Sequence, residues 1–548
     1  MIKIVWKFFL AILLVQSFMF ANELDYQDDA SMVISNSLKA QPQHKFLKHL
    51  YKRVLYMPIW MKEHSLSKPA TELFDYIKHD KTLDPNGKLY NDALLLHQMA
   101  QDIYTRDGSL ADKVSMEFKI SQIYQGYMNY LYFGSINWGA FKARISNLMI
   151  DDVHTDWVLH RPNVDPIAIA ENALFTHELS KQLDAHIPTQ YHYKALQKAL
   201  IRYMDIKKNG GWNKVVLQTN KLSPNHKDIG VKSIKERLKV TGDYQGEVDD
   251  NTLYDDTLVE AVKKFQARHG LVSDGIIGKG TLQVLNESVD DKIKKIRLNL
   301  DRIKWLKDRK SRYHIVINIP DFRLYFEDNG KLIQTMKVIT GKPNHPTPIF
   351  GDLVELIVLN PYWNVPTSII QKEMIPKLLR NPNAMKKKGI EIRSGWGKDA
   401  KIVNPSSVNW AAYRYTKRVP YRFAQVPGYK NALGKIKFLF PNRFSVYMHD
   451  TPTKNLFKRN VRAFSHGCVR LQKPRELLKT FASIDKSIDL EKAFEILKGK
   501  KNTTIRLSKK IPVDIVYLTA FIDYDGNLQF RNDVYCYDKM QLKSFREW

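Results

Sequence analysis

The spacing of apolar residues changes near Tyr313, and this change constrains the fold more than any other feature. From about residue 30 to 220, apolar residues recur three and four positions apart, as in residues 70–77 and 116–124, which is typical of helices. From Tyr313 onward, apolar and polar residues alternate, as they do in strands. We therefore predict an α+β multidomain protein whose N-terminal part is mainly helical and whose C-terminal part is β-rich.

The alternating part has a recognisable sheet pattern with one long interruption. The expected strands are residues 314–319, 323–326, 335–340, 352–359, 444–449, 513–521 and 528–537. The segment 367–427 interrupts them with a helical pattern over 369–379 and a stretch rich in Lys, Gly and Pro. It is too long for an ordinary loop, so it predicts a capping subdomain or lid.

A chain of 548 residues exceeds one hydrophobic core, because domains usually hold roughly 100–200 residues. The predicted units are a signal peptide at 1–21, a helical scaffold at 22–224, a three-helix module at 225–288, a helical linker at 289–312, a catalytic domain at 313–510 with the capping insertion at about 367–427, and C-terminal strands at 511–548.

The first residues have the pattern of an export signal. Lys3 and Lys7 flank an apolar run at 8–20 that ends at Ala21, before a polar segment, as in secretory signal peptides. A membrane anchor is the alternative, but the run is shorter than the roughly 20 residues that a bilayer core requires. We expect cleavage, and no later apolar stretch is long enough to span a membrane.

The formal net charge of +29 calls for a partner of opposite sign. Nucleic acid, anionic lipid and cell-wall polymer carry such charge. Export excludes nucleic acid and leaves the envelope, whose peptide stems bear carboxylates. Solubility alone is the alternative explanation, since the lysines are scattered along the chain.

Only two cysteines occur, Cys468 and Cys536. Two are too few for a disulfide scaffold, and thiols tend to oxidise outside the cytoplasm. A disulfide between the two is the alternative, whereas the surroundings of Cys468 indicate a reaction centre.

His449 ends an expected strand, and Cys468 follows nineteen positions later, after Ser465, His466 and Gly467. A thiol needs a base to become a nucleophile, and an imidazole can take its proton and later return it to a leaving amine. Gly467 allows close backbone approach, so the Cys468 amide can face a developing oxyanion. Tyr447 precedes His449 by two residues and shares its face of the strand, where its hydroxyl can be a second donor.

Two histidines precede the cysteine, and we favour His449 over His466 as the base because residues two apart in a tight turn diverge. Asp450 or a backbone carbonyl would then orient the His449 imidazole. A metal site using Cys468 and both histidines is the other possibility, but a third or fourth ligand at a recognisable spacing is missing.

The pattern of His449, fifteen intervening residues and the run 465–468 resembles the signature of the YkuD-type L,D-transpeptidases. Further matches are found at 318–324, 341–343, 347–350, 360–366, 431–434 and 449–452. Together they are similar to the large YcbB-like subgroup, which combines a helical scaffold, a peptidoglycan-binding module and a catalytic domain with a capping insertion.

The compact unit at 225–288 is similar to the three-helix peptidoglycan-binding module of wall enzymes. Its expected helices are 231–240, 256–269 and a third after the segment 274–278. Phe265 and Leu271 would fill its core whether or not the module binds anything.

The resemblance implies a role for each matching residue. Cys468 would be the nucleophile and His449 its base, with Tyr447 and the Cys468 amide at the oxyanion. The residues implied in substrate binding are Ser465, His466, Gly467, Arg470 and Trp363. The commonest family signature has Asn where this chain has Arg470; an arginine can clamp a carboxylate in two hydrogen bonds, and a structural ion pair is the alternative.

The implied activity is a periplasmic peptidoglycan L,D-transpeptidase that forms 3-3 cross-links through a cysteine thioester and needs no metal or organic cofactor. Its partners would be the peptide stems and glycan strands of the wall, and carbapenem-type compounds would acylate it. The alternatives are an L,D-carboxypeptidase that trims tetrapeptide stems and a catalytically idle wall-binding scaffold.

Overall fold

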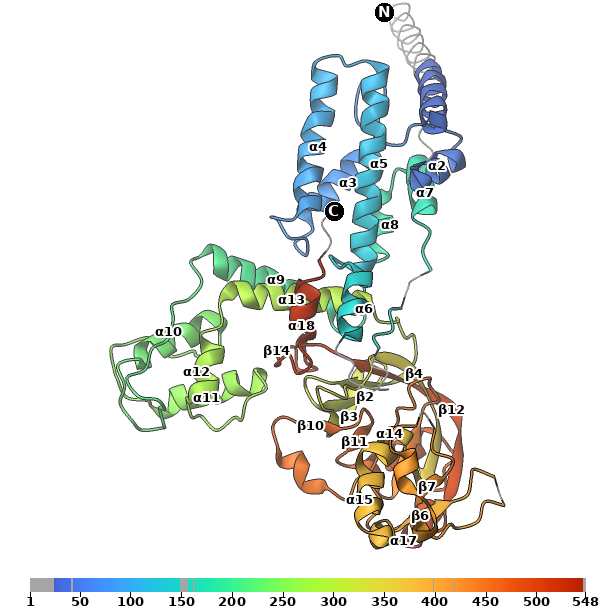
Figure 1. Ribbon diagram of the computed structural model, residues 1–548. Helices are drawn as coiled ribbons and strands as arrows, with labels where there is room; N and C mark the ends of the chain where they lie inside the picture. The colour runs from blue at the N-terminus through green and yellow to red at the C-terminus, as the bar shows by residue number, and fades with distance from the viewer. Residues whose placement is uncertain are drawn as a thin grey trace, which may run out of the picture.

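The computed structural model contains a helical scaffold, a three-helix module and a domain built on a large sheet (Figure 1). The described residues are 24–40, 43–147, 156–160, 163–397, 399–416 and 418–545. The predicted signal peptide at 1–21 lies outside them. No helix within these ranges has both the length and the apolarity to cross a bilayer.

The scaffold confirms the mainly helical N-terminal part. Its helices are α2 (Lys45–Arg53), α3 (Lys68–His79), α4 (Lys88–Thr105), α5 (Leu110–Phe133), α6 (Trp138–Ser146), α7 (Pro166–Thr176) and α8 (Leu179–Asp184). Trp60 lies fully buried in their core. Trp138 and Trp157 pack instead against the sheet domain, where they join Trp305, so one face of the scaffold is continuous with that domain's core.

Two helices connect the three parts. α9 (Tyr193–Lys208) and α13 (Val289–Lys304) pack side by side between the scaffold and the sheet domain, and they lead into the three-helix module at the left of Figure 1. The module's helices are α10 (Val231–Thr241), α11 (Asp256–Arg268) and α12 (Lys279–Leu285). They lie where the sequence places them, with Phe265 fully buried among them.

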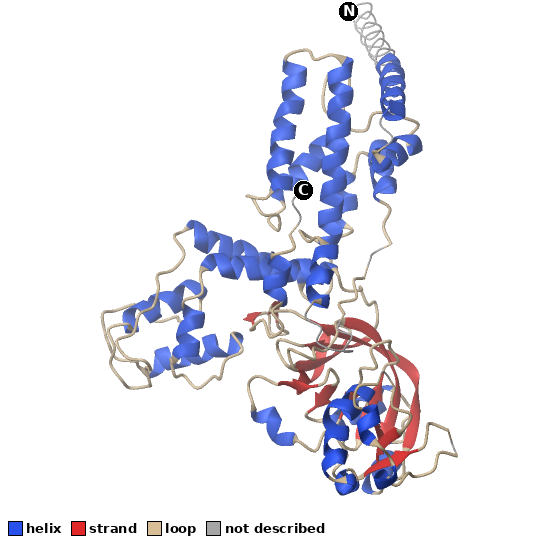
Figure 2. Ribbon diagram, viewed as in Figure 1, coloured by secondary structure: helices blue, strands red, loops and turns tan. Residues whose placement is uncertain are grey.

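Among the described residues, the main sheet of the sheet domain has nine paired strands, drawn red in Figure 2. They are β1 (Tyr313–Asn318), β2 (Arg323–Asp328), β3 (Lys331–Gly341), β4 (Phe350–Leu359), β8 (Ile436–Leu439), β9 (Met448–His449), β10 (Ala463–Ser465), β11 (Val469–Leu471) and β12 (Thr503–Val516). Their order is β10-β3-β11-β9-β8-β4-β12-β1-β2, and β2 pairs again with β3. The pairings therefore close into a ring.

The ring encloses a core that two helices complete. α16 (Pro474–Ile484) and α17 (Leu490–Lys498) lie against it. Phe481 of α16 packs on Phe326 and Phe438, which belong to strands far apart in the order. The helices thus join opposite parts of the ring.

The long interruption forms a capping subdomain with its own sheet and core. Its elements are β5 (Trp363–Asn364), α14 (Thr367–Ile369), a π-helical turn (Ile370–Met374), α15 (Ile375–Arg380), β6 (Ile390–Arg393) and β7 (Arg422–Gln425), with short 3₁₀ turns at Pro382–Ala384, Lys386–Lys388, Pro405–Ser407 and Trp410–Tyr413. The sheet order is β5-β7-β6. Because β5 pairs with β7, the subdomain starts at Trp363 rather than at about 367.

The sheet also resumes earlier than the alternation predicts, at β8. Of the expected strand 444–449, only Met448 and His449 are extended and paired. Ser445 has a φ of 55°, and the Asn442 side chain accepts hydrogen bonds from the Phe444 and Val446 amides. This local turn replaces the first part of the strand.

The last strands differ from the expected boundaries as well. β12 runs across residues 510 and 511, and it pairs with β4 and, in parallel, with β1, so residues 511–516 belong to the catalytic sheet. A small hairpin follows, formed by β13 (Ala520–Ile522) and β14 (Leu528–Phe530). The expected strand 528–537 ends at Phe530, and α18 (Tyr537–Leu542) comes next.

Asp514 of β12 ties the scaffold and the linker to the ring. Its carboxylate accepts hydrogen bonds from Arg309, from His314 Nε2 at 2.8 Å and from the Tyr191 hydroxyl at 2.9 Å. Burial alone would raise the pKa of Asp514, but the His314 hydrogen bond and the Arg309 charge outweigh it and hold the pKa below its ordinary value. The Asp514 carboxylate is therefore ionised, and both of its oxygens accept hydrogen bonds.

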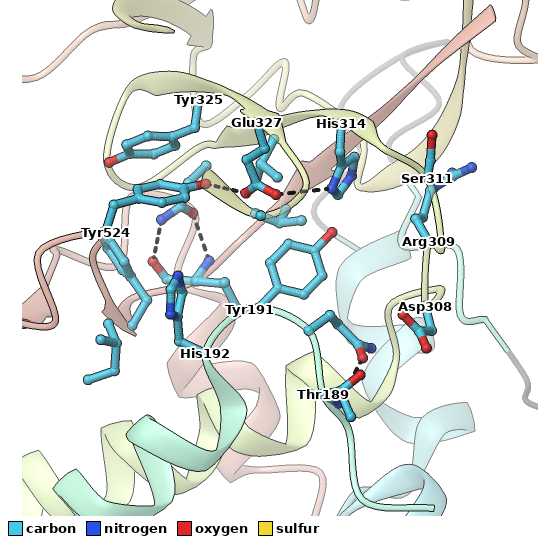
Figure 3. Close-up of a pocket in the computed structure, with 18 of the residues that line it drawn as sticks. Thr189, Tyr191, His192, Asp308, Arg309, Ser311, His314, Tyr325, Glu327 and Tyr524 are labelled. Carbon is cyan, nitrogen blue, oxygen red and sulfur yellow. Dashed lines mark hydrogen bonds and ion pairs between the residues drawn. The ribbon is translucent and has the colours of Figure 1, made fainter. Parts of the chain in front are cut away.

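A cavity of about 560 Å³ lies beside this network, between the loop that carries Tyr191 and strands β1 and β2 (Figure 3). Figure 3 shows Tyr524, Glu327 and His314 along its wall: the Tyr524 hydroxyl donates a hydrogen bond to the Glu327 carboxylate, whose other oxygen lies 3.8 Å from His314 Nδ1. No residue of β9, β10 or β11 lines it, so this cavity is separate from the cysteine.

Replacing Asp514 with Ala should strongly destabilise the contact that joins the scaffold and the linker to the strand ring. Arg309 and His314 would remain buried without their partner, at a cost of roughly 3–5 kcal/mol. Hydrogen exchange of the peptides that cover β1 and β12 should accelerate at least about a hundredfold. Asp525→Ala, at an exposed turn, is the control; equal exchange in the two variants would contradict the role of Asp514.

Candidate active site

The cysteine lies in a three-residue turn, 466–468, that connects β10 to β11. Ser465 pins the turn: its hydroxyl donates to the Cys468 carbonyl at 2.6 Å and accepts from the Gly467 amide at 3.2 Å. Thr347 donates to the Gly467 carbonyl at 2.8 Å. Gly467 has a φ of 109°, a conformation that only glycine adopts easily. The turn is thus fixed by the backbone and by two hydroxyls.

Strand pairing brings His449 to this turn. β9 and β11 are parallel neighbours in which Arg470 pairs with His449, and the Val469 amide donates to the Tyr447 carbonyl at 3.1 Å. The Tyr447 and His449 rings lie 5.6 Å apart. Tyr447, His449 and Cys468 are therefore gathered at one rim of the sheet.

His449 is buried and neutral. Its Nδ1–H donates to the Asp450 backbone carbonyl at 2.5 Å, whereas the Asp450 carboxylate bonds Lys435 and Lys454. The carbonyl, not the carboxylate, thus orients the ring and leaves Nε2 as the proton acceptor. Burial and the nearby Arg470 charge lower the pKa of His449 to about 3.

Cys468 is half-buried, and its thiol contacts Ser445 O at 3.9 Å. Burial raises the pKa of the thiol, although a hydrogen bond with Tyr447 and the Lys437 charge act in the other direction. The resting site therefore holds a neutral thiol and a neutral imidazole. Cys536 is exposed and free, so no disulfide joins the two cysteines.

Lys437 belongs to the site although the sequence analysis did not select it. It pairs with His449 across β8 and β9, and its Nζ lies 3.7 Å from the centre of the Tyr447 ring. Burial lowers the pKa of Lys437, and Cys468 opposes that shift. A lysine between the apolar residues of a short strand was the available signal, but strand β8 itself was missed.

Arg470 is a cation without a carboxylate partner within the described residues. Its Nε is buried and has no hydrogen-bond acceptor there, and no ion pair joins it to an acidic residue in the same part of the chain. Such a group is costly to bury unless something pairs with it. This arrangement favours a ligand carboxylate over the structural ion pair.

The capping subdomain touches the catalytic turn through His466. His466 Nε2 lies 3.1 Å from the Glu373 carboxylate, and its ring is 5.0 Å from that of His345. Glu373 and Trp363 also line a pocket of about 290 Å³ on the subdomain. His466 therefore faces the cap. In the described ranges, no three His, Cys, Asp or Glu side chains cluster as metal ligands.

A thiol, a neutral imidazole with a free nitrogen and a phenolic donor, set at the rim of a β-sheet, are the groups of a cysteine acyl-transfer site. Residues 312–501 match the family model described as the L,D-transpeptidase catalytic domain, YkuD. Residues 45–200 match a model described as the scaffold domain, and residues 228–285 match one described as "Putative peptidoglycan binding domain". The chain thus contains a YkuD L,D-transpeptidase catalytic domain together with a peptidoglycan-binding domain, as its sequence predicts.

A protein of Haemophilus influenzae named "Putative L,D-transpeptidase" is 32% identical over 247 residues, which are 45% of this chain and 48% of that protein. The match thus spans about half of the relative's length. An L,D-transpeptidase structure from Stackebrandtia nassauensis is 17% identical over 52% of this chain and 89% of its own, with a TM-score of 0.21. One from Mycobacterium smegmatis is 12% identical over 37% and 58%, with a TM-score of 0.18.

Removing the Lys437 charge should make the thiol harder to ionise. In Lys437→Met, the pH at which iodoacetamide alkylates Cys468 at half its maximal rate should rise by about 0.5–1 unit, because a nearby cation favours the thiolate. All proteins should carry Cys536→Ser so that only one thiol reacts. Lys435→Met is the matched control, since the Lys435 Nζ contacts the carbonyls of Leu497 and Gly499 instead; a shift of equal size in both would refute the assignment.

Proposed function

We propose that the protein is a peptidoglycan L,D-transpeptidase that forms 3-3 cross-links through a thioester on Cys468. The observation that carries the proposal is that the thiol stands immediately before β11, the strand that pairs with the one carrying a neutral, oriented His449, inside the part of the chain that matches the transpeptidase catalytic family. The peptidoglycan-binding domain supports stem peptides and glycan strands as partners, and with the predicted signal it supports action in the periplasm.

The first half-reaction would use the neutral pair directly. As the Cys468 sulfur attacks the carbonyl carbon of the third stem residue, its proton passes to His449 Nε2. The carbonyl oxygen becomes negative, and two donors can stabilise it: the Tyr447 hydroxyl and the Cys468 amide, which has no acceptor among the described residues. His449 then protonates the departing amine of the terminal residue as the C–N bond breaks.

The second half-reaction would reverse these roles. The side-chain amine of the third residue on a neighbouring stem attacks the thioester, and His449 takes a proton from that amine. Collapse of the intermediate expels the thiolate, which His449 reprotonates. No external oxidant, reductant or metal enters the balance of either step.

The remaining residues fit roles in holding the stem. Arg470, whose Nε has no acceptor among the described residues, can pair with a stem carboxylate. Ser465 and Gly467 would fix the turn, while His466 and Trp363 would form part of the contact between the cap and the substrate. Lys437 would stabilise the thiolate as it leaves.

An L,D-carboxypeptidase is the second candidate, because water can attack the same thioester. The capping subdomain that contacts the turn at His466 favours a bulky acceptor over water. The idle scaffold remains the alternative from a different class, and the buried, oriented His449 argues against it.

The decisive experiment incubates tetrapeptide muropeptides with the wild type and with Cys468→Ala, followed by mass analysis of the products. We expect a 3-3 dimer with the wild type and none with the variant. Tripeptide monomer without dimer would make the protein a carboxypeptidase, and identical products from both proteins would refute Cys468 as the nucleophile. Acylation of Cys468 by a carbapenem would test the thiol alone.

The identity of the base can be tested by comparing two histidine variants. We expect His449→Ala to slow acylation by about 10²- to 10⁴-fold, as for loss of a general base, and His466→Ala to slow it by at most about tenfold. Because the pKa of His449 is about 3, the wild-type acylation rate should show no fall near pH 6.5 as the pH is lowered. A larger loss in His466→Ala would reverse the assignment.

A further inference from the structure

A groove of about 380 Å³ separates the peptidoglycan-binding domain from the catalytic domain. One wall is the end of α11 and the loop 270–273, and the other is formed by residues 320–323 and 458–462. The walls are joined directly: the Asn460 side-chain amide donates to the Gly270 carbonyl at 2.7 Å, and Arg531 donates to the Arg268 carbonyl at 3.0 Å. The groove is therefore a fixed feature of the domain contact.

The lining of the groove carries more positive than negative charge. Its cationic side chains are Arg323, Lys337, Lys458, Arg459, Arg462 and Arg531. Asp321 is the single carboxylate in the lining, and it already accepts hydrogen bonds from Arg531 Nε at 2.5 Å and from the Tyr325 hydroxyl. Across the described residues, none of the other five cations forms an ion pair with a carboxylate.

The cations also act on one another. Burial and the charges of Arg323 and Arg531 lower the pKa of Arg462 to about 10, with Asp321 opposing them. Burial, Arg462 and Arg323 likewise lower the pKa of Lys337. A groove with uncompensated positive potential attracts an anionic ligand and is stabilised by it.

A short stretch of chain connects the groove to the catalytic turn. Arg462 immediately precedes β10, which enters the turn at Ser465, and the six residues from Arg462 to Cys468 span at most about 20 Å. An extended four-residue stem covers roughly 13 Å. A stem in the groove therefore lies within reach of one that occupies Cys468.

Sugar rings fit this groove less well than carboxylates do. Protein sites for sugars usually offer an exposed aromatic face, but the one aromatic side chain in this lining, Phe322, is buried beneath the Arg462 guanidinium. The lining offers the guanidinium groups of Arg323 and Arg459 and the Lys458 ammonium instead, which can pair with carboxylates. The Arg462 guanidinium already donates to five backbone carbonyls and adds its charge to the groove.

We propose that this basic groove binds the carboxylates of a second peptide stem of the wall polymer and so holds a neighbouring strand close to Cys468. The identity of the polymer rests on the proposed function. The charge, the geometry and the connection to the catalytic turn are properties of the groove itself.

The test measures binding of a purified disaccharide-tetrapeptide to the full chain carrying Cys468→Ala, which prevents turnover. Lys458→Gln/Arg459→Gln removes two exposed groove cations and should weaken binding by about tenfold at low salt, with a flatter salt dependence. Lys500→Gln/Lys501→Gln removes the same charge from an exposed loop outside the groove and should leave binding unchanged. The tetrapeptide with its carboxylates amidated should bind weakly to all three proteins.

Equal binding by the groove variant and the Lys500/Lys501 control would overturn the proposal, as would equal binding of the amidated fragment. Inorganic polyphosphate that binds the groove while the tetrapeptide does not would overturn the peptide assignment in favour of a phosphate polymer. Carbapenem acylation, measured in proteins that retain Cys468, should be the same in the groove variant and the wild type. If the wild type is not acylated but tetrapeptide binding still depends on the groove, the proposed function fails and the groove assignment stands.

Discussion

The closure of the strand ring on β3 is the constraint on which the catalytic site depends. The first part of β3 pairs with β2, while its last residues pair with β11 on one side and β10 on the other. The strands that enter and leave the cysteine turn are therefore both fixed to β3. β9 lies against β11 and carries His449, so the distance between imidazole and turn is set by backbone hydrogen bonds rather than by loop packing, as a preorganised site requires.

The electrostatic environment of the site keeps the thiol and the imidazole neutral in the resting protein and stabilises the charges that form during the reaction. Burial keeps His449 unprotonated and the Cys468 thiol protonated, while Lys437 and Arg470 supply two cations within the same small volume. These cations lower the cost of a thiolate or a carboxylate that arrives with substrate. The site is thus arranged to stabilise the thiolate and the substrate carboxylate, which are absent from the empty site. The empty site leaves the Arg470 Nε buried without an acceptor among the described residues.

The sequence predicts the domain order and most elements because each depends on local periodicity. The helices of the three-helix module and strands β1 to β4 lie close to where the spacing of apolar residues places them. Sequence-based prediction is wrong where tertiary contacts determine the secondary structure. Strand β8 has only four residues, too few for a clear alternation, and β12 continues the ring beyond the expected domain boundary. Cys468, Tyr447 and His449 were selected because motif spacing marks them. Lys437 was not, since its role comes only from pairing with His449 across two strands, and the basic groove unites residues separated by about half the chain.

The position of β12 also sets an order of events. This strand lies between β1 and β4, yet it is the last of the nine strands along the chain, and α18 follows it to pack against α6 and α13. During synthesis, which starts at the N-terminus, the scaffold and the three-helix module can fold early. Strands β1 and β4 cannot be joined until β12, which ends at residue 516, has been made. The thiol therefore meets its imidazole only in a nearly complete polypeptide, and a chain truncated before this strand carries every site residue without a closed ring to hold them.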